Sequence, residues 1–201
     1  MKKRVIFIIL IVLVIIGLIW LCVFSTRNNE TDNIKFSKEY TNVGIDNVFI
    51  YKTADDIISI LEHGTGVVFL GFPECQWCQK YVTFVNDIAK NNDVVVNYFN
   101  ISNDRKENTS SYQKMVSILS NQLASDNAYD KDGHLRIFVP TIVVVKNGEI
   151  VGFDDETAHD TKNYKSPDDY WKNEDLDGLK QKLDDLFKLV GPSFCSTGCN
   201  D

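Results

Sequence analysis

The feature that most constrains the fold is a pair of cysteines between an apolar run and an amphipathic stretch. The run over residues 66–72 is rich in β-branched and aromatic residues, and it predicts a short buried strand. Cys75 and Cys78 follow it, and the apolar residues after them recur at spacings of three and four. This spacing predicts a helix over about 76–90. Both cysteines are therefore expected where a buried strand ends and a helix begins.

This placement gives the two sulfurs different chemistry. Residues three apart on a helix share a face, so the two sulfurs can approach each other. The first helical turn has unpartnered N–H groups and the positive end of the helix dipole, which lower the pKa of a Cys75 thiol below its usual value of about 8.5. Cys78 begins one turn deeper and is expected to be more buried. We interpret Cys75 as the nucleophile and Cys78 as the thiol that resolves a mixed disulfide.

Two other interpretations of this pair remain open. Cys75 and Cys78 could form half of a zinc site with Cys195 and Cys199 near the C-terminus, or they could form an inert structural disulfide. The strand-to-helix placement favours the redox interpretation, and we expect neither a metal nor a cofactor. Cys195 and Cys199 are candidates for a second disulfide that holds the end of the last helix. They could also be a second redox pair or unpaired thiols.

The N-terminal segment predicts a membrane anchor. Three basic residues at 2–4 precede the run 5–24, which has no charged residue and matches the roughly 20 residues needed to cross a bilayer. The positive-inside rule then places the N-terminus in the cytoplasm and everything after the run outside. We expect an anchor over 1–24, a polar linker over 25–44 and one domain over 45–201. The alternatives are a cleaved signal peptide and a lipidated Cys22.

Charge and cysteine usage fit an exported domain. Three of the 21 basic residues precede the apolar run and all 28 acidic residues follow it, so the exported part has a formal charge of −10. Without a basic patch, nucleic acid is not an expected partner. An exported compartment lets disulfides persist, and four of the five cysteines lie in two close pairs beyond the run.

A second informative stretch covers residues 136–146, where Pro140 interrupts an apolar strand. Proline cannot donate to a strand ladder, so it marks the first residue of a strand or an edge. Asn147-Gly148 then predicts a tight hairpin to a last strand over 149–153. Further strands are expected over 47–51 and 94–99. Helices are expected after Thr53, after Ser111 and over 175–190, and residues 154–171 are expected to be irregular.

The resulting order, βαβαβαββα, predicts parallel early strands and a final hairpin. With the CxxC at Cys75–Cys78 and the tripeptide Val139-Pro140-Thr141, this order resembles the thioredoxin superfamily over about residues 45–190. The chain as a whole resembles membrane-anchored, extracytoplasmic thioredoxin-like proteins of Gram-positive bacteria. The resemblance implies a three-layer α/β fold preceded by one transmembrane helix.

The resemblance also implies roles for individual residues. It implies a cis bond at Val139–Pro140 beside the CxxC, with the Val139 backbone placed to pair with a partner's extended chain. A trans proline at a strand start is the alternative. Trp77 would supply an exposed aromatic contact. Phe69 stands where thioredoxins have a buried acidic residue, so proton transfer to Cys78 would need another route.

The sequence is therefore compatible with two functions. The first is a single-pass, membrane-anchored thiol–disulfide oxidoreductase that uses the Cys75-Gln76-Trp77-Cys78 pair on the outer side of the cell membrane. Its partners would be exported protein thiols or disulfides, or a membrane redox partner. The second is a binding or secretion-accessory module of the same fold that uses the groove without turnover.

Overall fold

The computed structural model describes residues 31–123, 129–130, 132–160 and 162–192. The expected anchor over 1–24 and both tail cysteines, Cys195 and Cys199, lie outside the described residues. Among the helices of the described ranges, none is both long and apolar enough to cross a membrane. The described residues from Asp32 onward belong to one compact unit.

A mixed five-stranded sheet forms the centre of this unit. The strands are ordered β1-β3-β2-β4-β5 across the sheet. β1, β3 and β2 are parallel, whereas β4 runs antiparallel to β2 and forms a hairpin with β5. The predicted parallel early strands and final hairpin are confirmed, and the sheet fits a thioredoxin-like α/β fold. The strands are β1 Phe49–Tyr51, β2 Gly66–Gly71, β3 Val96–Asn100, β4 Thr141–Lys146 and β5 Glu149–Asp154.

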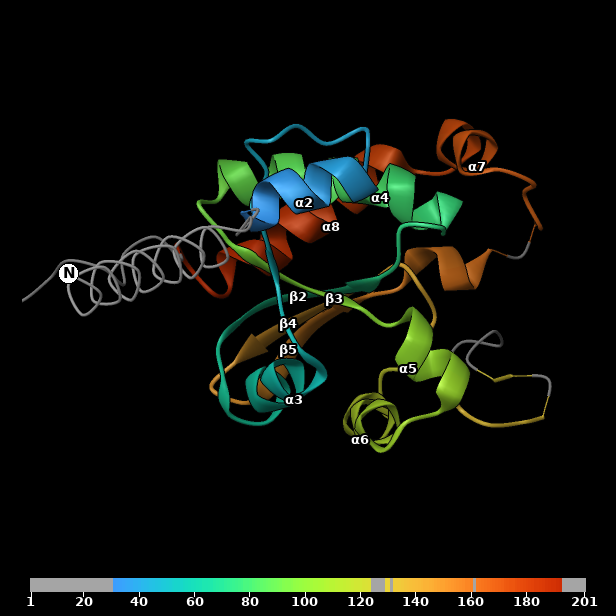
Figure 1. Cartoon of the computed structure of the whole chain (residues 1–201). Coiled ribbons are helices and arrows are strands. Elements are labelled where there is room, and N and C mark those ends of the chain that lie inside the picture. The colour runs from blue at the N-terminus through green and yellow to red at the C-terminus, as the bar shows by residue number, and fades with distance from the viewer. Residues whose placement is uncertain (1–30, 124–128, 131, 161, 193–201) are drawn as a thin grey trace, which may run out of the picture. The chain divides into compact units, whose positions relative to one another are not determined.

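Helices cover both faces of the sheet, which gives the three expected layers. Figure 1 shows α2, α4 and α8 on one face and α3 and α6 on the other. The helices are α2 Asp32–Glu39, α3 Ala54–His63, α4 Gln76–Asn91, α5 Ser102–Glu107, α6 Ser110–Leu119, α7 Pro167–Asn173 and α8 Leu176–Lys188, with a 3-10 turn, η2, at Glu156–His159.

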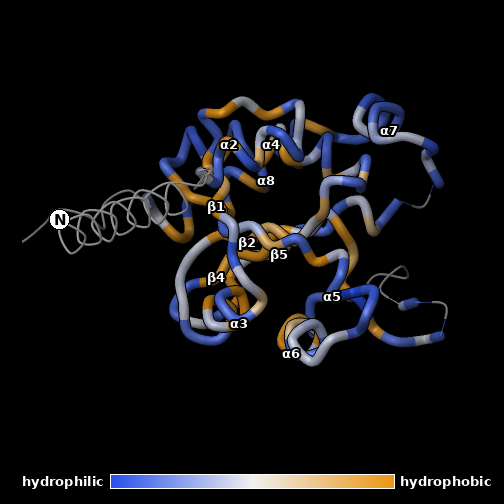
Figure 2. The backbone as a smooth tube through the Cα atoms, in the orientation of Figure 1, coloured by the Kyte–Doolittle hydropathy of each residue, from blue (hydrophilic) through white to orange (hydrophobic). Residues whose placement is uncertain are grey.

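The core centres on β2, whose six residues are all buried. A strand covered by helices on both faces needs apolar side chains in both directions, and residues 67–70 supply them without interruption. Full burial of one such side chain contributes about 1.5–3 kcal/mol. Figure 2 shows the same contrast across the fold, with hydrophobic strands inside and a largely hydrophilic α7 outside. β2 therefore gives the loop that follows it a rigid support.

The start of α3 is fixed by local chemistry, as predicted. Thr53 is the N-cap: its hydroxyl accepts the Asp56 N–H at 3.2 Å, and the Asp56 carboxylate accepts the Thr53 N–H at 3.0 Å. This reciprocal capping box satisfies two amides that the helix itself leaves unpaired.

The expected linker over 25–44 differs from the structure in its second half. Residues 32–39 form α2, and Phe36 is fully buried, with its ring stacked on Phe49 at 3.9 Å and on Tyr40 at 4.4 Å between centroids. The domain therefore begins near Asp32 rather than residue 45. The polar composition concealed the helix, because Phe36 is its one fully buried side chain and Tyr40, also buried, follows just after its end.

Two other segments also differ from expectation. Residues 154–171 are not wholly irregular, because η2 forms there and α7 begins at Pro167. After β3, the helix expected after Ser111 is present as α6, although Thr109 rather than Ser111 caps it by accepting the Tyr112 N–H, and an unexpected short helix, α5, precedes it. The unexpected elements, η2, α5 and α7, are short and mostly polar, so hydrophobic periodicity gives them little signal.

Candidate redox site

The strand register brings the two informative stretches to one end of the sheet. Leu70 at the end of β2 pairs with Thr141 at the start of β4. Since these strands are antiparallel, the loop that leads from β2 to Cys75 and the residues just before β4 emerge at the same end. β3 also ends here, because Asn100 pairs with Gly71. Cys75 and Pro140 are therefore brought to the same end of the sheet.

Cys75 is the N-cap residue of α4, as the sequence predicts. Its backbone is extended, with φ −81° and ψ 111°, and its Sγ accepts the Cys78 N–H at 3.2 Å. The Cys75 N–H donates to the Phe72 carbonyl at 3.2 Å, and the Gln79 N–H donates to the Cys75 carbonyl at 3.0 Å. The sulfur thus lies at the positive end of the helix, where negative charge is stabilised.

The pKa values of the two thiols are shifted in opposite directions. A hydrogen bond from the Cys78 side chain, followed by backbone N–H groups of Cys78 and Trp77, lowers the pKa of Cys75 despite its partial burial. Cys78 is fully buried, and this burial raises its pKa well above the usual value, as does its hydrogen bond to Cys75. The expected difference in burial is confirmed. The pair therefore combines a thiolate that forms readily with a thiol that holds its proton.

Arg105 is a basic residue of the site that sequence analysis missed. Its guanidinium carbon lies 5.2 Å from the centre of the Phe72 ring, and its Nη1 donates to the Ile137 carbonyl at 3.5 Å. Arg105 thus connects the loop before Cys75 with the segment before Pro140. Its charge lowers the pKa of Cys75 and of Cys78. It lies in α5, and no sequence spacing links it to the cysteines.

A pair of buried tyrosines lies within electrostatic range of the cysteines. The Tyr40 hydroxyl donates to the Tyr98 hydroxyl at 3.2 Å, and both residues are fully buried. Burial raises both tyrosine pKa values, and the charge of a Cys78 thiolate raises them further. The Phe69 ring, which stands where thioredoxins have a buried acidic residue, packs against both tyrosines. The polar groups beside Phe69 are therefore the two tyrosine hydroxyls. The sequence did not predict a place for Tyr40 near the site, because Tyr40 lies in the segment that was expected to be a linker.

Val139 and Pro140 are joined by a cis peptide bond, as expected from the resemblance. Both side chains are buried, so a partner would meet mainly the backbone of this segment. The Thr141 hydroxyl donates to the Phe138 carbonyl at 2.6 Å, across the proline. The pairing of the Val139 backbone with a partner chain stays a prediction.

Trp77 differs from the expectation of an exposed aromatic contact. Its side chain is half-buried, and its ring meets Tyr170 of α7 edge to face, with 5.4 Å between centroids. The reason is α7, because a segment that was expected to be irregular folds over this flank of α4. One side of the Trp77 indole therefore packs against α7 of the same protein.

The zinc alternative has no support among the described residues. No group of three or more His, Cys, Asp or Glu side chains in the described ranges is arranged to hold a metal ion. The four-cysteine site would need Cys195 and Cys199, which lie outside those ranges. The proposed second disulfide between these two cysteines stays a prediction for the same reason.

No protein-family model and no curated protein matches the chain. Among solved structures, the chain is similar to oxidized thioredoxin O2 from Arabidopsis thaliana, with 14% sequence identity and a TM-score of 0.39. The match covers 71% of this chain and 96% of the plant protein. Because this likeness is low, we assign the fold from the strand order and connectivity of the sheet.

Proposed function

We propose that the protein is a thiol–disulfide oxidoreductase in which Cys75 is the nucleophile and Cys78 the resolving thiol. The observation that carries this proposal is the position of Cys75 at the N-cap of α4, where the Cys78 N–H and thiol both donate to its sulfur. A thiolate is the reactive form in disulfide exchange, and this environment favours it.

The reaction runs in two exchanges. The Cys75 thiolate attacks one sulfur of a client disulfide, a mixed disulfide forms, and the other client sulfur leaves as a thiolate that takes up a proton. Cys78 then loses its proton and attacks the Cys75 sulfur, which forms the Cys75–Cys78 disulfide and releases the second client thiol. The client gains two electrons and two protons, and the reverse sequence oxidises a client dithiol.

We further propose that the domain acts on the outer side of the cell membrane, held by residues 5–24 as a single-pass signal-anchor. The uncharged run of twenty residues behind three basic residues supports this location. The clients would then be exported proteins with thiols or disulfides, or a redox partner in the membrane. Protease accessibility of the domain on intact cells tests this location, and a domain protected until the cells are opened would contradict it.

Trapping experiments on the full-length protein test the exchange. Cys78→Ser should accumulate a mixed disulfide between Cys75 and a disulfide-bonded peptide, because the second exchange is blocked. Cys75→Ser should form no such adduct, and the double variant Cys195→Ser/Cys199→Ser should react like the parent protein. Mass spectrometry identifies the adducts. Full turnover by Cys75→Ser, or a parent protein inert toward peptide disulfides, would overturn the proposal.

A further inference from the structure

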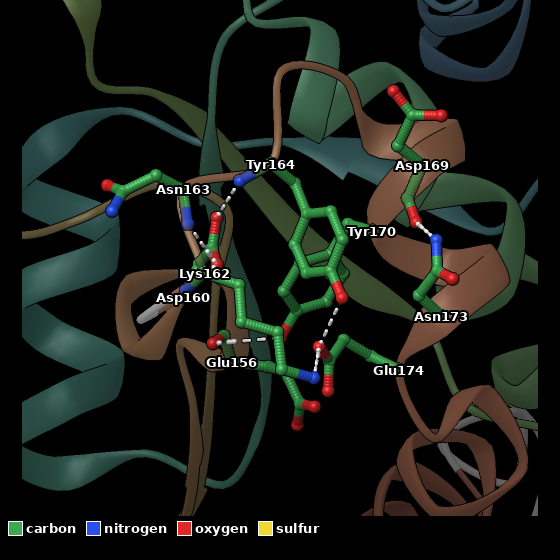
Figure 3. A network of polar contacts seen from close by, with 9 residues as sticks. All are labelled: Glu156, Asp160, Lys162, Asn163, Tyr164, Asp169, Tyr170, Asn173 and Glu174. Atoms are coloured by element: carbon green, nitrogen blue, oxygen red, sulfur yellow. Dashed lines mark hydrogen bonds and ion pairs between the residues drawn. The ribbon is translucent and has the colours of Figure 1, made fainter.

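A pocket of about 380 Å³ shares Arg105 with the redox site and is lined mainly by polar side chains. Its charged groups are arranged differently from those of the segment before α8. There, the Glu174 carboxylate accepts Lys162 Nζ at 2.6 Å and the Tyr164 hydroxyl at 2.9 Å, so opposite charges meet inside a closed network (Figure 3). In the pocket, cations and carboxylates instead line an open space that is large enough for a small ligand.

One wall of the pocket carries donors that suit a carboxylate. Arg105 and Lys106 of α5 both line it. Arg105 contacts the Phe72 ring and the Ile137 carbonyl, which are neutral groups, so its charge stays available to a ligand. The Tyr112 hydroxyl of α6 accepts the Ile137 N–H at 3.1 Å, so its own proton can be donated into the pocket. A ligand carboxylate can accept from all of these donors.

A second wall is a turn that carries carboxylates. Asp130 Oδ1 accepts the backbone N–H groups of Asp132 and His134, each at 2.9 Å, and the Asp130 N–H donates to the His134 carbonyl at 2.9 Å. The turn is therefore held in place from within. Asp130 Oδ2 lies 3.4 Å from His134 Nδ1, so the Asp130 carboxylate serves the turn itself. Asp132 lines the pocket and is exposed, which makes it the carboxylate open to a ligand.

The balance of charge in the pocket favours a ligand that carries both signs. Arg136 adds a third cation to the two on α5, and the turn adds two carboxylates. A simple anion is attracted by the cations and repelled by the carboxylates, whereas a zwitterion gains from both. We propose that this pocket binds a small molecule with a free α-amino acid group, whose carboxylate meets Arg105 and Lys106 and whose ammonium meets Asp132.

Arg105 connects the pocket to the redox site. Its charge lowers the pKa of Cys75, and a ligand carboxylate beside Arg105 offsets part of that charge. An occupied pocket should therefore make Cys75 less acidic, and by reciprocity an ionised Cys75 should weaken the binding of the ligand. The inference goes beyond the proposed function, because binding of the ligand requires no disulfide exchange.

Calorimetric titration of the full-length reduced protein with L-leucine tests the inference. Leu135 lines the pocket and offers an apolar contact to the leucine side chain. 4-Methylpentanoate and 3-methylbutylamine are matched probes, because each keeps that side chain and lacks one of the two charged groups. Leucine should bind about fivefold more tightly than either probe, and Lys106→Gln and Asp132→Asn should each weaken its binding by a similar factor.

Glu107→Gln and Lys165→Gln are the controls, because they remove the same kinds of charge from exposed positions outside the pocket lining. Both should leave the affinity for leucine unchanged. Saturating leucine should also raise the pH midpoint of Cys75 alkylation in the parent protein, and an unchanged midpoint would contradict the link through Arg105.

Three results would overturn the inference: no binding of leucine, equally tight binding of 4-methylpentanoate, or an unchanged leucine affinity in both Lys106→Gln and Asp132→Asn. The second result would show a plain anion site, and the third would place binding elsewhere on the protein. A parent protein that binds leucine in this pocket but is inert toward peptide disulfides would refute the proposed function and leave the inference standing.

Discussion

At the scale of single residues, the chemistry of the site depends on the charges and hydrogen bonds around one sulfur. Cys75 receives hydrogen bonds from its neighbours in α4, and Arg105 supplies a positive charge from α5. The hydrogen bond from the Cys78 side chain has the largest effect on the Cys75 pKa, and the Arg105 charge adds a smaller effect in the same direction. The cysteine pair itself was predictable from sequence, because its spacing and its position after an apolar strand are local features.

Replacing Arg105 should change the acidity of Cys75. Arg105→Gln is expected to raise the Cys75 pKa, whereas Arg105→Lys should retain part of the effect through its charge. The pKa is read from the rate of iodoacetamide alkylation against pH, which in the parent protein should reach half its maximum below about pH 8.5, the midpoint for an ordinary cysteine.

Lys106→Gln is the control for this change, because it removes the same charge from the adjacent position in α5. It should leave the alkylation midpoint where it is. Equal shifts in Arg105→Gln and Lys106→Gln would show that net charge, rather than the placement of Arg105, sets the acidity of Cys75.

The buried hydroxyl pair gives a second prediction at this scale. Tyr98→Phe removes the acceptor of the Tyr40 hydroxyl and leaves a buried donor unsatisfied, at a cost of about 1–3 kcal/mol in the free energy of unfolding. The double variant Tyr40→Phe/Tyr98→Phe removes both groups and should lose less than the two single losses combined. Urea unfolding measures all three, and additive losses would argue against the hydrogen bond.

At the scale of elements, most boundaries follow from periodicity and capping, and the exceptions share one cause. The strands, α3, α4 and α8 carry clear apolar patterns, and Thr53 and Cys75 begin their helices as predicted. The sequence did not predict α2 and α7, because each is short and polar and is stabilised by tertiary contacts between aromatic rings. The contact of Trp77 with Tyr170 could not be predicted without α7.

The assignment of α2 to the domain can be tested by mutation. Phe36→Ala should lower the free energy of unfolding by about 3–5 kcal/mol, because it empties a fully buried aromatic site. Ile34→Ala on the same helix should cost little, since Ile34 is 38% exposed. A small loss in Phe36→Ala, similar to that in Ile34→Ala, would restore the interpretation of residues 32–39 as a linker.

At the scale of the whole molecule, buried tyrosines link stability to alkaline pH. Burial raises the pKa of Tyr40, Tyr81 and Tyr98, and the charge of Asp154, which accepts the Tyr81 hydroxyl, adds to the rise at Tyr81. Each stabilising contribution is fully present below the unfolded pKa of about 10 and declines as pH rises above it. Each buried tyrosine should therefore cost about 1.4 kcal/mol of stability per pH unit above that point.

Urea unfolding between pH 8 and pH 11 measures this decline. Tyr81→Phe should reduce the slope by the contribution of one proton, because it removes a buried phenol whose pKa is raised. Equal slopes in the parent protein and Tyr81→Phe would show that Tyr81 ionises in the folded protein as readily as in the unfolded chain.

Equilibrating the full-length protein with glutathione redox buffers tests most directly whether Cys75 and Cys78 form a redox couple. Alkylation and mass spectrometry then report the state of each cysteine at each potential. We expect Cys75 and Cys78 to become protected together in one two-electron transition, at a potential between about −270 and −120 mV. Independent oxidation of the two thiols, or a Cys75–Cys78 pair that stays reduced in the most oxidising buffer, would contradict a redox role for the site.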